Sequence, residues 1–235
     1  MPDDVTILDL AAAVWFLATW VGYVVLQAHP RGQGLNQRMQ DIRRVWMSQL
    51  VERDVRIVDS GLLGHSIHSI TFFASTTMLV LGGLIGLLGA VDRIHDVLGS
   101  LAFAARTGPA FVEFKLFVLI GAFAFGFFQF TWALRQYNFL CALIGSAPLP
   151  SAAPETKAAA ARHLARVMSL AVSSFNGGLR AYYFAIALVA WFIHPIAFLA
   201  MSTLVFGVLI RRQRWSRTVS AIRSECDTLK ADRPL

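Results

Sequence analysis

A stripe of polar and small residues follows the apolar segment 68–91 and the turn before it. At about 100° per residue, His65, His68, Ser69 and Thr76 fall on one helical face. The same face carries small residues, and Gly82-x-x-x-Gly86 has the spacing that lets membrane helices approach closely. The stripe favours close helix packing, and the alternative is the polar lining of a pore or cavity.

Two further polar residues lie on one stripe of the apolar segment 111–134. Gln129 is the most deeply placed polar group there, and an amide at that depth needs a hydrogen-bonding partner. We expect Gln129 to bond a neighbouring helix or to line a path. Lys115 lies near the outer end, where a lysine side chain extends its ammonium toward the interface. With the first stripe, Lys115 and Gln129 complete the candidate pore lining.

Four polar residues gather at the expected inner interface, namely Arg135, Asn138, Asn176 and Arg180. Two guanidinium groups and two amides are suited to a lipid phosphate or another anion. The alternative is ordinary basic residues flanking a membrane span.

The chain lacks the residue patterns that catalysis and metal binding require. It contains no Gly-x-Ser-x-Gly, no His-Glu-x-x-His, no P-loop and no paired carboxylates inside an apolar segment. His65 and His68 have metal-ligand spacing, but nothing nearby completes a site. We therefore expect no catalytic residue, no metal and no cofactor.

The composition is that of a polytopic membrane protein. Of 235 residues, 56% are hydrophobic and only 15% are charged. The net charge is +7, but the basic residues lie in loops and tails beside apolar segments. That placement follows the positive-inside rule and attraction to anionic lipids, so we expect a lipid bilayer as partner and no nucleic acid.

The elements that must position these residues form one all-α membrane domain. Five membrane spans are expected at about 7–26, 68–91, 111–134, 180–194 and 195–210. Two amphipathic cytoplasmic helices are expected at about 36–59 and 155–175, and a basic tail at 211–235. Asn176-Gly177-Gly178 is expected to end the second amphipathic helix.

The stretch 182–210 decides the topology, because it contains no Asp, Glu, Lys or Arg and holds His194-Pro195 near its middle. If it crosses twice, 18 Lys and Arg lie on one side and 2 on the other; if once, the split is 11 and 9. The positive-inside rule favours two crossings, with the C-terminus in the cytoplasm. The alternative is four spans, the last one long and kinked at Pro195.

Several short motifs resemble a bacterial family of small multi-span inner-membrane proteins known as a domain of unknown function. They are residues 40–44, Gly178-Leu179-Arg180-Ala181-Tyr182-Tyr183, Trp191-Phe192, His194-Pro195 and Arg211-Arg212. The resemblance implies a helical protein of the bacterial inner membrane and carries no activity, substrate or site residue.

The sequence predicts a small homo-oligomeric channel or transporter for ions or small anions, because one chain with so few spans is small for a complete transport path. The alternative is a non-transporting scaffold or regulatory protein whose arginine-rich loops dock a cytoplasmic partner. Arg43 and Arg44 are the residues expected to capture that partner.

Overall fold

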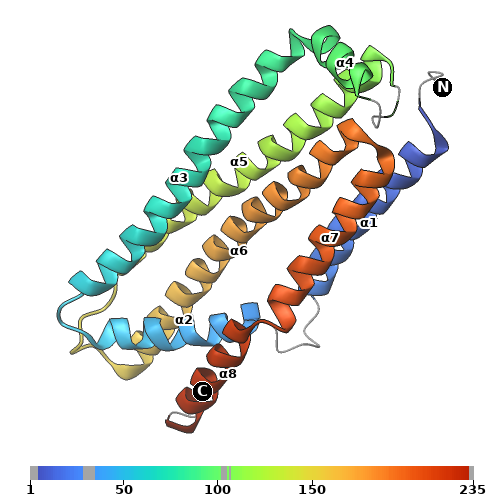
Figure 1. The fold of residues 1–235 in the computed structure, drawn as a ribbon. Coiled ribbons are helices and arrows are strands. Elements are labelled where there is room, and N and C mark those ends of the chain that lie inside the picture. Colours follow the sequence, from blue (N-terminus) through green and yellow to red (C-terminus); the bar gives the residue numbers. More distant parts are fainter. Residues whose placement is uncertain (1–4, 29–34, 102–104, 106, 233–235) are drawn as a thin grey trace. The chain divides into compact units, whose positions relative to one another are not determined.

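The computed structural model describes residues 5–28, 35–101, 105 and 107–232. Their regular elements are all helices: α1 (Ile7–Ala28), α2 (Leu35–Glu52), α3 (Ile57–Leu88), α4 (Val91–Ser100), α5 (Pro109–Gly145), α6 (Pro154–Ile193), α7 (Pro195–Arg214) and α8 (Arg217–Asp232) (Figure 1). The expected all-α fold is confirmed.

Four segments are long and apolar enough to cross a membrane, namely Ile7–Gln27, Ile57–Leu88, Pro109–Gly145 and Pro195–Cys226. They make the chain a polytopic helical membrane protein. The segment 180–194, expected as a further span, forms the C-terminal part of α6 and is not among the four. The five-span arrangement therefore stays a prediction.

The helices divide into two compact units. Unit 1 takes in the described residues of 1–30, 75–128 and 178–210, and unit 2 those of 31–74, 129–177 and 211–235. Helices α3, α5, α6 and α7 contribute residues to both.

Proline starts three of the long helices, because Pro109, Pro154 and Pro195 are the first residues of α5, α6 and α7. A proline at this position loses nothing, since its missing N–H would have no partner inside the helix. His194, the residue before Pro195, caps α7, because its Nδ1 accepts a hydrogen bond from the backbone N–H of Ile196 at 3.1 Å. The chain reverses direction there, so α7 runs back beside the end of α6 (Figure 1). The stretch 182–210 is a helical hairpin and not one kinked helix.

Helix α6 corrects two expectations about 155–175 and its end. It continues without interruption from Pro154 to Ile193, so Asn176-Gly177-Gly178 does not end a helix. A Cβ added at Gly177 would lie 3.2 Å from the side-chain amide of Gln129 on α5. Glycine therefore leaves room here for close packing of two helices, and a neighbouring helix outweighs its weak helical propensity.

The segment 36–59 also differs from its expected single helix. α2 ends at Glu52 and α3 begins at Ile57. Glu52 and Arg56 have the i,i+4 spacing of a helical ion pair, but Glu52 accepts a hydrogen bond from Lys157 Nζ at 2.6 Å. Arg56 instead donates to the carbonyls of Ile144 and Pro148, at the end of α5 and just after it. Long-range partners at the helix ends thus replace the local ion pair.

The core of unit 1 is strongly aromatic. The ring of Phe16 on α1 lies 5.6 Å from that of Phe184 on α6 and 5.2 Å from that of Phe198 on α7. Trp20 stacks on Phe184 with a centroid separation of 5.0 Å. This set, Phe16, Trp20, Phe184 and Phe198, is the aromatic cluster of unit 1.

Unit 2 contains the polar helices α2 and α8 as well as parts of the longer helices. α2 packs against α8, and the buried Cys226 thiol lies 3.6 Å from the carbonyl oxygen of Arg38. The C-terminal segment, expected only as a basic tail, therefore forms a helix with its own packing partner.

Candidate functional site

The most heavily buried charges of unit 1 lie around Trp191. Lys115 is 1% exposed and Asp9 is 2% exposed. The indole N–H of Trp191 donates to Oδ1 of Asp9 at 2.8 Å, and the Trp191 carbonyl accepts from Lys115 Nζ at 3.0 Å. Trp191 thus connects a buried acid on α1 with a buried base on α5. We call Asp9, Lys115 and Trp191 the Lys115 cluster.

Local helix chemistry explains how Asp9 is held. Thr6 and Asp9 form a capping box at the start of α1: the Asp9 N–H donates to Thr6 Oγ1 at 3.2 Å, and the Thr6 N–H donates to Asp9 Oδ2 at 3.3 Å. The Thr6 hydroxyl also donates to Oδ2 at 2.5 Å. A carboxylate in the first turn is stabilised by the positive end of the helix dipole.

The ammonium group of Lys115 is held by the C-terminal end of α6. Trp191 belongs to the last turn of α6, where backbone carbonyls have no partner inside the helix. The ammonium therefore completes a helix C-terminus, where a positive charge is favoured. Its Nζ also lies 4.6 Å from the centroid of the Phe111 ring and 5.5 Å from that of Trp191. Cation–π contacts of this kind compensate in part for burial of the charge.

A second polar group of unit 1 lies at the far end of α1. Nη1 of Arg180 donates to Oε1 of Gln27, and Nε2 of Gln27 donates to the hydroxyl of Tyr23 at 2.8 Å. The guanidinium also lies 5.8 Å from the centroid of the Tyr23 ring. Arg180 is partly buried in this arrangement. Tyr23, Gln27 and Arg180 are the Arg180 cluster.

The candidate lining of α3 proves to be mainly a surface. His65 and His68 are exposed, and the hydroxyl of Ser69 donates to the carbonyl of His65 in its own helix at 3.1 Å. Thr76 is partly buried, whereas its neighbour Thr77 is fully buried and lies 2.8 Å from the hydroxyl of Tyr182. The polar contact between α3 and α6 is therefore one residue away from the expected position.

Of the two candidate lining residues of α5, Lys115 is buried and Gln129 is partly buried. Lys115 is not extended toward the interface as expected, because the end of α6 and two aromatic rings surround it. Gln129 lies close to Gly177 of α6, and its expected hydrogen bond to a neighbouring helix stays a prediction.

The expected anion site is not assembled within one unit. Arg135 and Asn138 are exposed in unit 2, and the Arg135 guanidinium lies over the ring of Phe139 at 5.6 Å. Asn176 is partly buried in unit 2, and Arg180 belongs to unit 1.

Unit 2 uses several loop arginines internally. Arg43 is 7% exposed and donates to Ser169 Oγ at 3.4 Å. Burial lowers the pKa of the Arg43 guanidinium, and nearby Tyr137 acts in the opposite direction. Arg53 and Trp46 donate to Oδ1 of the buried Asp59 at 2.6 Å and 2.7 Å. Arg43, expected to capture a partner, is therefore engaged inside unit 2.

Sequence reasoning missed Asp9, Trp191 and Thr77. The Thr6-x-x-Asp9 spacing is a helix-start signal that could have identified the capping role of Asp9. No local pattern predicts the link from Asp9 to Trp191, because 182 residues separate them.

A family model described as a protein of unknown function, DUF599, matches residues 11–218. Neither a curated protein nor a solved structure matches the chain. The matched range includes Lys115, Arg180 and Trp191 and begins just after Asp9.

Proposed function

The chain belongs to the DUF599 family of proteins of unknown function, and we propose that it is a small oligomeric channel or transporter for ions or small anions. The observation that carries the proposal is a pair of cations in unit 1, one buried and one partly buried, with the aromatic cluster in the core of the same unit. Ionisable groups inside membrane segments are costly, and where they occur they commonly mark an ion pathway.

Lys115 and Arg180 are well placed to attract an anion one after the other. Lys115 binds α6 at Trp191, and Arg180 lies on α6 itself, so the two α6 positions are about 16 Å apart along the helix at 1.5 Å per residue. Phe184, part of the aromatic cluster, lies between these two positions on α6. An apolar constriction with a cation on either side attracts an anion and blocks it until the rings move apart.

Self-association is supported by the open face of α3. A Cβ added at Gly82, Gly83 or Gly86 would meet no atom within 4 Å. Glycines four residues apart on a membrane helix allow a second helix to approach closely. A bacterial inner-membrane location with a cytoplasmic C-terminus accords with the distribution of basic residues.

The test is flux through liposomes that contain the purified protein, measured separately for chloride, nitrate and potassium. Lys115→Gln and Arg180→Gln each remove one cation, and Lys157→Gln and Arg162→Gln are matched changes outside the proposed path. We expect anion flux above that of protein-free liposomes, strongly reduced by the first two variants and retained by the controls. Folded, inserted protein without flux, or with flux that ignores both cations, would overturn the proposal.

The alternative is a scaffold or regulatory protein that docks a cytoplasmic partner. It is favoured by the exposure of Arg44, whose side chain is 63% accessible. Arg43 is unsuited to this role because it is buried. If the scaffold reading is right, Arg44→Gln abolishes capture of the partner, and no variant has an effect in the flux assay.

A further inference from the structure

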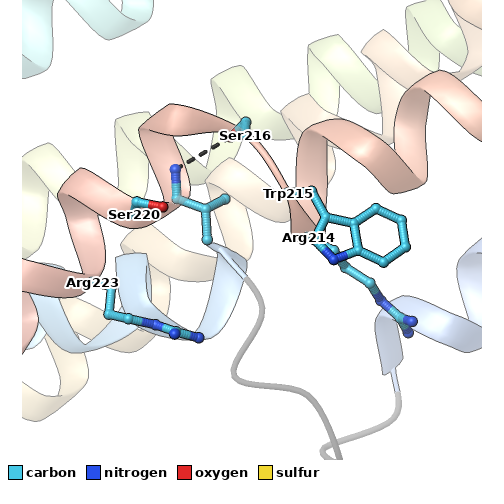
Figure 2. Close-up of a pocket in the computed structure, with 6 residues that line it drawn as sticks. Arg214, Trp215, Ser216, Ser220 and Arg223 are labelled. Atoms are coloured by element: carbon cyan, nitrogen blue, oxygen red, sulfur yellow. Dashed lines mark hydrogen bonds between the residues drawn. The ribbon is translucent and has the colours of Figure 1, made fainter.

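A cavity of about 470 Å³ lies in unit 2 where α7 ends and α8 begins. It is lined by Arg214, Trp215, Ser216, Val219, Ser220 and Arg223 (Figure 2). Two arginines and two serines are therefore among the residues that line one concave site, and guanidinium and hydroxyl donors match the oxygens of a phosphate group.

The region around the cavity is strongly electropositive. Residues 211–225 contain five arginines and one glutamate. The N-terminus of α8, a helix of 16 residues, lies at the same place and adds the positive end of its dipole. Ser216 caps this terminus, because its Oγ accepts the N–H of Val219 at 3.2 Å (Figure 2).

The position of the cavity along the chain distinguishes between sources of phosphate. The apolar part of α7 ends at Ile210, and Arg214 follows one turn later. A helix that leaves the hydrocarbon at Ile210 places Arg214 at the depth of the lipid headgroups. Trp215 is 73% exposed, as expected for an indole in the interfacial aromatic belt.

From these observations we infer that the cavity binds the phosphate headgroup of an anionic phospholipid. Arg214 and Arg223 contact the phosphate oxygens, the two serines supply further hydrogen bonds, and Trp215 lies against the upper acyl chain. This site is separate from the residues that the sequence suggested for a lipid phosphate, namely Arg135, Asn138, Asn176 and Arg180, and the inference does not depend on the proposed transport function.

The inference is tested with full-length protein in nanodiscs of equal phosphatidylglycerol and phosphatidylcholine, with brominated acyl chains on one lipid or the other. Bromine quenches nearby tryptophan, and the difference between the wild type and Trp215→Phe isolates the signal of Trp215. Overall composition and surface charge are identical in the two preparations, so unequal quenching reports local enrichment. We expect severalfold stronger quenching by brominated phosphatidylglycerol, since each basic group near an anionic surface contributes about fivefold.

The double variant Arg214→Gln, Arg223→Gln should make quenching by the two lipids equal. Arg162→Gln, Arg166→Gln removes the same charge from exposed positions of α6 and should leave the preference intact. Equal quenching in the wild type would overturn the inference without any variant. A preference that the double variant retains would also overturn it. Equal quenching, together with binding of inorganic phosphate to the wild type but not to the double variant, would assign the cavity to free phosphate.

Discussion

The hydrogen bond between Trp191 and Asp9 is the contact whose loss has the clearest expected effect. It joins the C-terminal end of α6 to the first turn of α1 and measures 2.8 Å from Nε1 to Oδ1. Both side chains are nearly inaccessible, at 4% and 2% exposure. Asp9→Ala leaves the indole N–H buried without its acceptor and also removes the capping box with Thr6.

The expected cost of Asp9→Ala follows from these two losses. An unsatisfied buried donor costs about 1–3 kcal/mol, and loss of a helix cap typically costs about 1 kcal/mol. The sum is about 2–4 kcal/mol of unfolding free energy. Of this loss, the hydrogen bond between Trp191 and Asp9 should account for about 1–1.7 kcal/mol. This is the upper end of the range for hydrogen bonds between membrane helices, because the acceptor is a carboxylate.

A double-mutant cycle separates that part from the capping loss. Unfolding free energies are measured in mixed micelles for the wild type, Asp9→Ala, Trp191→Phe and the double variant. Trp191→Phe removes the N–H donor and disturbs the stacking on Phe198 at 4.8 Å, but this packing loss is common to both arms and cancels. The coupling energy that remains reports the hydrogen bond.

A coupling energy of about 1 kcal/mol or more is the expected result. A value near zero, with both single variants folded, would show that the N–H of Trp191 finds another acceptor at no cost. The description of Trp191 as the link between Asp9 and Lys115 would then be wrong.

Two further predictions concern the helix contacts of unit 1. Thr77→Val removes the hydrogen bond to Tyr182 and should lower the unfolding free energy by about 0.6–1.7 kcal/mol. The control, Thr76→Val, should change it by less than about 0.5 kcal/mol. Equal effects of the two variants in the same micelle assay would contradict the contact. Gly126→Leu should lower the unfolding free energy by about 1–3 kcal/mol, because even a Cβ at this position would lie 3.3 Å from the Cβ of Ala181. Gly121→Leu on the same helix faces open space and is the control; equal losses would disprove close packing at Gly126.

Periodicity in the sequence was sufficient to predict the helical class, but it divided α6 into two elements and joined α2 to the start of α3. It could not predict which residue of a face meets a neighbour. Thr76 and Thr77 are 100° apart on α3, and the stripe of small residues favours Thr76, yet Tyr182 of α6 meets Thr77. The difference is one residue, and it depends on the rotation of α3, which is fixed by partners distant in sequence.

Glycine shows the same limit in another form. In a single sequence, Asn176-Gly177-Gly178 has the composition of a helix end. In the fold, a Cβ at Gly177 would lie 3.2 Å from the side-chain amide of Gln129, and a Cβ at Gly126 would lie 3.7 Å from the carbonyl oxygen of Gly178. The two readings of Gly177-Gly178 can be distinguished only once α5 is known to pack there.

The Lys115 cluster combines a structural and a proposed functional role, and the two make different demands on the ammonium group. As the partner of the Trp191 carbonyl, Lys115 needs only a hydrogen-bond donor, which the amide of glutamine also supplies. As an attractor of anions, it needs its positive charge. Lys115→Gln therefore weakens anion flux far more than it weakens folding if both roles are present. A parallel loss of stability and flux would instead make Lys115 a cap of α6, and the selectivity for anions would then depend on Arg180 alone.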